Sequence, residues 1–243
     1  MAISNQLLSA LPPPERARLM ARMEPVELAL RQVLQEPGDP IAQVYFIERG
    51  VVSLTLPLEG GVMAEVGLLN SEGMVGYQVA LGAEVATSEA VVQVPGTGLR
   101  LSAADLRTEL ARGGLLQKLL LRCALTMHIQ ISRTAACNAR HTLEERLARW
   151  LLMLQDKVMA DVLPVTHELI AMMLGVRRPG VSVAVGMLER MNAISHDRGS
   201  ITVKDRERLQ LAACECYATT QAEIAPVPMP VAEASPRKSI SVR

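Results

Sequence analysis

The segment from 166 to 203 constrains the fold of this chain more than any other. It reads THELIAMMLGVRRPGVSVAVGMLERMNAISHDRGSITV. Thr166 suits the cap of a first helix with apolar residues along one side, and Gly175 suits the end of that helix. Pro179 suits the start of a second helix, because the first turn does not need its missing N–H. We therefore predict two short helices joined by a tight turn.

Small and branched residues in this segment predict how the two helices cross. Ala171 allows a close approach, Gly175 permits the backbone turn, and Val181 fills the corner between the helices. Residues 197–200, Asp-Arg-Gly-Ser, are typical of a hairpin turn between two short strands. These features predict a winged helix-turn-helix, a structure that presents a helix to DNA. The alternative is a pair of core helices and a hairpin that serve stability alone.

The composition permits substantial cores but indicates no partner. The chain has 243 residues, 49% of them hydrophobic, which is enough for one large or two modest domains. Its 25 basic and 25 acidic residues give a formal net charge of zero, so only local charge can favour nucleic acid. Aromatic residues make up 2%, which disfavours the stacking platforms of single-strand binders. Duplex recognition stays open.

Nothing in the sequence indicates a membrane, a cofactor or a metal. No apolar run approaches a membrane span, and the N-terminus lacks a cationic start and a small-residue cleavage site. A cytoplasmic protein is therefore expected. The cysteines form neither a CxxC pair nor a disulfide framework, so reduced thiols without a metal are expected at Cys123, Cys137, Cys214 and Cys216.

The N-terminal half changes from helical to strand-rich. Residues 5–23 predict two short helices around a run of prolines. From 24 to 101, short β-rich runs alternate with turn residues, and this spacing predicts a β-roll or barrel. The expected strands include 43–47, 51–56 and 90–94, and the expected turns are 36–39, 48–50, 59–61 and 95–98.

A long helix is predicted to start after Gly114 and to end near Asn138. One set of its residues recurs alternately four and three positions apart, which is the spacing of a heptad seam between paired helices. The polar members Gln130 and Thr134 suit a seam where each meets its own copy, so a parallel homodimer is predicted. The expected seam comprises Leu116, Leu120, Cys123, Met127, Gln130, Thr134 and Cys137.

The flanking face of this helix is expected to pack on the β-roll, through Leu121, Ala124, Leu125, His128 and Ile131. A helix buried in a monomer is the alternative. On the predicted seam Cys123 and Cys137 would each face its own copy, and a symmetric redox crosslink is one hypothesis. The other is that both are inert, small apolar residues.

The next helix has a clear start and an apolar face. Thr142 and Glu145 form a capping box, in which each side chain bonds the backbone of the other residue. Trp150 is expected to anchor its apolar face. Residues 138–141 are a candidate hinge between the two helices. The Pro- and Ala-rich end, 218–243, is expected to be a disordered tail.

The order of these elements resembles the Crp/Fnr family of bacterial transcription regulators. The resemblance covers roughly residues 5–215 and rests on four motifs: VYFIERGVV at 44–52, EGMVG at 72–76, ERLARWLL at 145–152 and ELIAMMLGVRR at 168–178. It implies an α+β fold: a cyclic-nucleotide-binding-like β-roll (1–112), a dimerisation helix (113–138), a winged helix-turn-helix (139–217) and a tail (218–243). It also implies a homodimer that binds a palindromic operator in double-stranded DNA and contacts RNA polymerase.

The effector pocket departs from the pattern of the cyclic-nucleotide members of that family. They hold the phosphate with a Gly-Glu pair and a later Arg, whereas this chain has Gly76, Tyr77 and no Arg in 85–89. A cyclic phosphate would lose its charged partner and face Glu89, so cyclic AMP is not the expected effector, which stays unknown. The degenerate pocket is expected at Met74, Gly76, Tyr77, Thr87, Ser88, His128, Ile131 and Ser132.

Two other sensing modes of the family lack their ligands here. Its oxygen sensors hold an iron–sulfur centre with an N-terminal cysteine cluster, but the first cysteine of this chain is Cys123. The four histidines are scattered, so no haem ligand stands out.

The second helix of the helix-turn-helix is expected to enter the major groove. Relatives commonly use a Glu and an Arg there, and this chain has Pro179 and Val183 at those positions. Arg178 is expected to contact a guanine, and Val183 a thymine methyl. The expected interface comprises Arg177, Arg178, Gly180, Ser182, Val183, Arg190, Arg198 and Ser200, with Lys204 and Arg206 as further candidates. The alternative for the charged residues near the hairpin is a solvated surface.

Two functions are therefore compatible with the sequence. One is a dimeric, sequence-specific transcription regulator with an orphan sensor domain. The other is a non-DNA ligand-binding or scaffold protein, in which the winged helix contacts protein. An enzyme is not expected, because there is no convergent nucleophile–base pair and no phosphate-cradling glycine loop.

Overall fold

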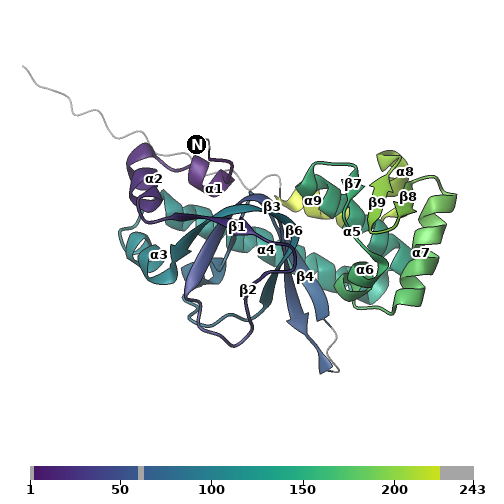
Figure 1. The fold of residues 1–243 in the computed structure, drawn as a ribbon, viewed down its shortest axis with the longest axis horizontal. Helices are drawn as coiled ribbons and strands as arrows, with labels where there is room; N and C mark the ends of the chain where they lie inside the picture. The colour runs from purple at the N-terminus through teal and green to yellow at the C-terminus, as the bar shows by residue number, and fades with distance from the viewer. Residues whose placement is uncertain (1–2, 60–62, 225–243) are drawn as a thin grey trace, which may run out of the picture.

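The computed structural model describes residues 3–59 and 63–224. Helices α1 (Gln6–Ser9) and α2 (Pro13–Met20) begin the chain, as predicted. They lead into a β-roll at one end of the molecule, and a winged helical module lies at the other end (Figure 1). The Asn5 side chain caps α1 by accepting from Leu8 N at 3.2 Å, and its amide nitrogen also donates to the carbonyl oxygens of Ile47 and Gly73 at 2.9 Å. The lead-in is thereby tied to the roll.

The roll is one antiparallel sheet in the order β1-β6-β3-β4, with β2 added to β6 and β5 to β3. A short 3₁₀ helix, η2 (Tyr77–Leu81), follows β5. The strands are β1 (Glu24–Leu28), β2 (Val33–Gln35), β3 (Gln43–Pro57), β4 (Met63–Leu69), β5 (Met74–Val75) and β6 (Glu89–Ser102). The predicted β-roll is confirmed.

Two of the predicted turns, 48–50 and 95–98, are instead irregular stretches inside continuous strands. β3 pairs with β6 on both sides of Gly50, and the register shifts there. Gly50 has a φ of +92°, and a Cβ at this position would lie 2.5 Å from the carbonyl oxygen of Val94. Glycine therefore marks a close crossing of two strands rather than a chain reversal. The turn at 36–39 is present, with Asp39 N bonded to Glu36 O; the turn predicted at 59–61 extends outside the described residues.

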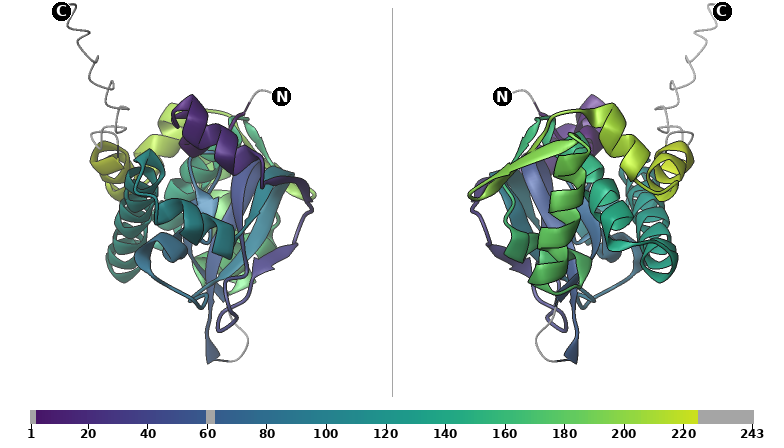
Figure 2. Two further views of the ribbon diagram at one scale, coloured as in Figure 1. Left: turned by 90° about the vertical axis from the view of Figure 1, so that its left-hand side faces the viewer. Right: turned by 90° about the vertical axis from the view of Figure 1, so that its right-hand side faces the viewer.

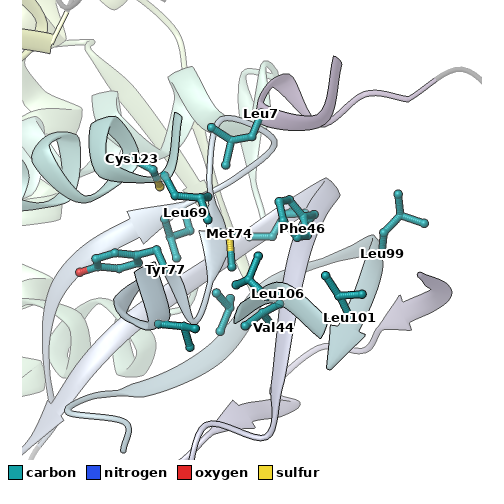
Figure 3. Packing of buried hydrophobic residues seen from close by; sticks show 14 of the residues in the cluster. Leu7, Val44, Phe46, Leu69, Met74, Tyr77, Leu99, Leu101, Leu106 and Cys123 are labelled. Atoms are coloured by element: carbon teal, nitrogen blue, oxygen red, sulfur yellow. The ribbon is translucent and has the colours of Figure 1, made fainter. Parts of the chain in front are cut away.

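Helix α4 (Leu115–Arg140) closes the roll after the short helix α3 (Ala103–Leu110). Figure 3 shows side chains from α1, the strands, α3 and α4 meeting in one core, among them Leu7, Phe46, Leu69, Leu106 and Cys123. α4 continues two residues beyond the predicted end at Asn138 and includes most of the predicted hinge. Only His141 and Thr142, both with extended backbone, separate it from the next helix.

The structure reverses the predicted roles of most residues on the two faces of α4, although Ala124 packs against the roll core as predicted. The expected dimer seam packs inside the chain against the roll and the winged module, because these residues are buried or, for Thr134, half-buried: Leu116, Leu120, Cys123, Met127, Gln130, Thr134 and Cys137. The expected roll-facing residues Leu121 and Leu125 are instead 44% and 46% exposed. The prediction that Cys123 and Cys137 meet their own copies is therefore wrong.

The winged module begins with α5 (Leu143–Val158), whose predicted capping box between Thr142 and Glu145 is present. The sheet order β7-β9-β8 gives the wing. The remaining elements are β7 (Val162–Leu163), α6 (His167–Leu174), α7 (Arg178–Arg190), β8 (Ile194–Asp197), β9 (Ser200–Val203), α8 (Arg206–Ala212) and α9 (Cys216–Ile224). The first residues of the predicted disordered tail thus belong to α9, which packs along α4 (Figure 2). The rest of that tail, 225–243, lies outside the described residues.

The two modules share a core. Val51 and Leu68 are roll residues, yet they pack with the buried side chains of α5, α6 and α7. Glu65 on β4 accepts a hydrogen bond from Trp150 Nε1 on α5 at 2.8 Å. The tryptophan is therefore an anchor, as predicted, and one of its partners is a buried carboxyl group of the roll.

Candidate nucleic-acid interface

Helices α6 and α7 form the predicted helix-turn-helix. Thr166 Oγ1 accepts from Leu169 N at 3.1 Å and caps α6, and Gly175 ends α6 with a φ of +63°. The axes of the two helices bend by 107°, within the range of this motif. Val181 is fully buried in the corner, as predicted. Pro179 occupies the second position of α7, where no N–H is needed.

No single helix in the described parts of the chain is long and apolar enough to cross a membrane. Among these residues, α6 and α7 reach the length and apolar composition of a membrane span only when they are counted together, and the two helices are sharply bent.

The outer face of α7 is exposed to solvent. Its inner face is buried through Val181, Ala184, Val185 and Leu188. Arg177, Arg178, Ser182, Val183 and Arg190 are exposed, and Val183 is 61% exposed although it is apolar. An exposed stripe with guanidinium, hydroxyl and aliphatic groups has the donors and methyl groups that read base edges in the major groove.

Arg178 is held in place from the preceding helix. Its Nε lies 2.5 Å from Glu168 Oε1, and both side chains are 63% exposed. Because solvent screens this pair, it contributes little to stability. Glu168 limits the positions that the Arg178 guanidinium occupies and leaves its other nitrogens free.

A histidine pair connects α7 to the wing. His167 Nδ1 lies 3.1 Å from Ser182 Oγ, and the rings of His167 and His196 are 5.3 Å apart. His196 contacts Glu189 Oε1 at 2.8 Å. Burial, the neighbouring His196 and Arg178 lower the pKa of His167, so its imidazole is neutral near pH 7. Sequence reasoning missed these contacts, because only the packed hairpin brings His196 to α6.

The wing presents part of the predicted interface. Arg198 is exposed in the two-residue turn between β8 and β9, and Gly199 in that turn has a φ of +91°. Ser200 is half-buried. Arg206 faces inward: its Nη2 lies 2.6 Å from both Asp156 Oδ1 and the Tyr217 hydroxyl oxygen. The suggestion that Arg206 contacts DNA is wrong, because this residue joins α8 to α5 and α9.

Gly180 has a packing role. A Cβ at this position would lie 3.1 Å from Leu143 Cδ2, so it faces α5 and is half-buried. A larger side chain would push α7 away from α5. Its predicted place at the DNA interface is therefore not supported by its orientation.

The residues expected to form the effector pocket do not share a cavity. Met74, Gly76, Tyr77 and Ser88 are buried, whereas Thr87, His128 and Ser132 are exposed and Ile131 is half-buried. The inner side of the roll is filled from α4 instead. A Cβ on Gly67 would lie 2.5 Å from Met127 Cε, and Gln130 Oε1 accepts from Leu68 N at 3.4 Å. The prediction of one pocket from these residues is wrong, because His128 and Ser132 lie on the outer face of α4.

The winged module has a recognisable sequence. Residues 145–212, from α5 to α8, match the family model described as the Crp-like helix-turn-helix domain. The chain carries a Crp-like helix-turn-helix domain. No curated protein sequence matches the chain.

The fold beyond the Crp-like domain matches solved regulators. FixK2 from Bradyrhizobium japonicum aligns with a TM-score of 0.69 at 15% identity, over 79% of this chain and 98% of that one. A putative regulator of the Crp/Fnr family from Eubacterium rectale aligns with a TM-score of 0.68 at 15% identity, over 85% and 97%. TTHB099, a CRP-family regulator from Thermus thermophilus, gives 0.65 at 19% identity, over 77% and 96%. These matches confirm the predicted resemblance. They also confirm the predicted architecture of a β-roll, a long helix and a winged module.

Proposed function

We propose that the protein is a sequence-specific DNA-binding transcription regulator without enzymatic activity. The observation that carries this proposal is the exposed face of α7, where Arg177, Arg178, Ser182 and Val183 project from a helix whose opposite face is packed. Arg198 in the wing adds a cation suited to a phosphate contact. The similarity of residues 145–212 to Crp-like domains supports the same reading.

We propose further that the protein is a homodimer joined along the exposed face of α4. A repeat with spacings of four and three residues lies on this face: Leu121, Leu125, His128, Ser132, Ala135 and Ala139 are all exposed. A groove of about 480 Å³ runs beside it and is lined by Leu125, Ile129 and Ala136 of α4 and by Glu223 of α9. A second copy of α4 would cover the leucines and enter this groove. This seam replaces the one predicted from the sequence.

The dimer determines the kind of DNA site. A two-fold axis along α4 would present two copies of α7, so we propose a palindromic operator with half-sites about one helical turn apart. The proposal includes contact with RNA polymerase and a cytoplasmic location. The interior of the roll is occupied by Cys123, Met127 and Gln130, and β6 begins at Glu89 rather than an arginine. Cyclic AMP is therefore not the proposed effector.

A binding selection from random duplexes tests the proposal. The full chain should enrich a palindrome, and its affinity should fall as salt rises. Arg178→Ala should cost about 1–3 kcal/mol at one base pair and relax specificity there, whereas Arg198→Ala should weaken binding to all sequences alike. Arg107→Ala, on the exposed surface of α3 in the roll, is the matched control and should leave binding unchanged.

Two results would contradict the proposal. Equal affinity for unrelated duplexes would favour the alternative in which the winged module contacts protein. Unchanged binding in both Arg178→Ala and Arg198→Ala would show that the interface lies elsewhere.

A further inference from the structure

Three cysteines and a histidine meet where α4 ends. Cys137, His141, Cys214 and Cys216 each bring one ligand atom to the same place, and all four atoms lie within 4.8 Å of one another. Cys137 Sγ is 3.5 Å from Cys214 Sγ, and Cys216 Sγ is 3.7 Å from His141 Nδ1. The sequence led us to expect reduced thiols without a metal, and the structure brings three of the four thiols together.

Local structure aims these side chains at one point. Cys137 lies in the last turn of α4, and the backbone N–H of His141 donates to its carbonyl oxygen at 3.0 Å. Cys214 and Cys216 lie where α8 gives way to α9, and Tyr217 N bonds to Cys214 O at 3.2 Å. The three cysteines are at most 6% exposed and form a buried cluster of their own, apart from the two apolar cores. Because this cluster consists only of cysteines and belongs to neither core, apolar packing does not explain why these thiols are buried.

The spacing fits a tetrahedral metal ion. Zn²⁺ binds cysteine sulfur at about 2.3 Å and histidine nitrogen at about 2.0–2.1 Å, which places tetrahedral ligand atoms about 3.5–3.8 Å apart. Two of the separations, 3.5 Å between Cys137 Sγ and Cys214 Sγ and 3.7 Å between Cys216 Sγ and His141 Nδ1, fall in that range. Three cysteines and one histidine are a common ligand set for structural zinc.

A carboxylate orients the histidine. Glu215 Oε2 lies 3.2 Å from His141 Nε2. The carboxylate accepts a hydrogen bond from Nε2–H, so the proton stays on Nε2 and the lone pair of Nδ1 is directed at Cys216. Histidines that bind metals are commonly held by such a carboxylate on the second nitrogen.

A buried cation beside the cluster also favours a negatively charged site. Arg149 is 5% exposed, and its charge acts on Cys137 and Cys216. Its Nη2 donates to Thr134 Oγ1 at 2.9 Å, but its Nε has no hydrogen-bond partner, and the guanidinium forms no ion pair with any residue of 3–59 or 63–224. A divalent ion with three thiolates carries a net charge of −1, which would balance this guanidinium.

We propose that Cys137, His141, Cys214 and Cys216 bind one Zn²⁺ ion per chain. Three thiol protons leave as the Zn–S bonds form, His141 binds as the neutral imidazole through Nδ1, and no electrons are transferred. The ion joins the end of the proposed dimer helix, His141 in the two-residue link between α4 and α5, and the start of α9. It thereby fixes the winged module relative to α4, and this role does not depend on DNA binding.

Metal analysis of the full chain tests the site. Protein purified under reducing conditions and supplied with equimolar Zn²⁺ should retain about one zinc per chain after gel filtration. Cys123→Ser removes a buried thiol of α4 outside the cluster and should retain the same amount. Cys216→Ser and His141→Ala should retain less than about a tenth. Glu215→Gln should keep the ion but bind it about 10–100-fold more weakly, as expected for a positioning residue.

Cobalt provides a second measurement on the unaltered protein. Co²⁺ in the same site should give the visible absorption of a tetrahedral ion with sulfur ligands, so the proposal can be tested even if a variant fails to fold. A wild-type chain that retains no zinc would overturn the proposal, as would equal loss in Cys123→Ser and Cys216→Ser. Iron with inorganic sulfide, or a Cys137–Cys214 disulfide in the reduced preparation, would also overturn it.

Discussion

Glu65 is the clearest case of a single residue that couples the two modules. It is 8% exposed, accepts from Ser53 Oγ at 2.7 Å within the roll, and accepts from Trp150 Nε1 at 2.8 Å across the module boundary. Burial raises the pKa of Glu65 to about 7, although both hydrogen bonds oppose the shift. Its protonation state therefore changes near neutral pH, inside the contact between the roll and the winged module.

This shift predicts a pH dependence of stability. Because the folded pKa is raised above the ordinary 4.5, the stabilising contribution of the carboxyl is complete below that pH and is lost as pH rises to about 7. The free energy of unfolding of the wild type, relative to Glu65→Gln, should fall by roughly 3 kcal/mol across this window. Urea unfolding followed by Trp150 fluorescence at several pH values measures it. Parallel profiles for the two proteins would contradict the shift.

Substitution of Gly50 and Gly82 distinguishes the cost of backbone strain from the cost of a steric clash. Both have left-handed backbone, with φ of +92° and +89°, but a Cβ on Gly50 would meet the Val94 carbonyl oxygen at 2.5 Å and one on Gly82 would meet nothing within 4 Å. Gly82→Ala should lose about 1–2 kcal/mol from its backbone alone. Gly50→Ala should lose clearly more, because the oxygen belongs to a paired strand. Equal losses in the free energy of unfolding, measured with urea, would show that the two strands move apart to accommodate the added methyl group.

At the scale of elements, local signals were sufficient for helix ends and insufficient for helix faces. The cap at Thr142 and the stop at Gly175 follow from neighbouring residues, and both were predicted. α4 has two overlapping heptad patterns, one through Leu116 and Leu120 and one through Leu121 and Leu125. Both have the same period, so only the packing of the roll decides which face is buried. The face with Gln130 is the buried one, and there Gln130 Oε1 accepts from Leu68 N of β4 at 3.4 Å.

The exposed pattern on α4 makes a prediction about assembly. Leu125→Glu places a charge in the proposed seam and should shift the protein from dimer to monomer in sedimentation equilibrium, because an unpaired charge is costly to bury. Leu81→Glu is the matched control: Leu81 is 57% exposed on the roll and should not affect the dimer. A dimer that survives Leu125→Glu would place the interface elsewhere.

The thiol cluster shows a different limit of sequence reasoning. Cys137 and Cys214 are 77 positions apart, and only the packing of α9 on α4 brings them together. Two local signals were present: His141 follows Cys137 by four residues, about one helical turn, and Cys214 and Cys216 are two apart. Each pair alone is a weak signal for a metal site, because it supplies only two of the four ligands that zinc needs.

At the scale of the whole molecule, the roll and the winged module are joined by a shared apolar core. Val51 and Leu68 belong to roll strands but lie in the core of the winged module. The turn of the helix-turn-helix also approaches the roll, since a Cβ on Gly175 would lie 3.8 Å from Ala64. The helix-turn-helix therefore contacts the sheet directly as well as through α4.

This shared core predicts a single unfolding transition. Trp150 is the only tryptophan and reports on the winged module, whereas far-UV circular dichroism reports on the whole chain. The two transitions should coincide. Leu106→Ala removes a fully buried leucine of the roll core and should lower the stability seen by both probes by about 2–5 kcal/mol. An unchanged Trp150 transition in this variant would mean that the modules unfold separately.

The side chains on the exposed face of α4 become smaller from the roll toward the winged module. It presents Leu121 and Leu125 beside the roll and Ala135 and Ala139 near the reader. Paired helices lie about 8–10 Å apart, depending on the size of the side chains between them. Two copies of α4 would accordingly form a wedge, wider between the rolls and narrower toward the DNA. The alanines, which make no polar contact of their own, would then set the distance between the two reading helices.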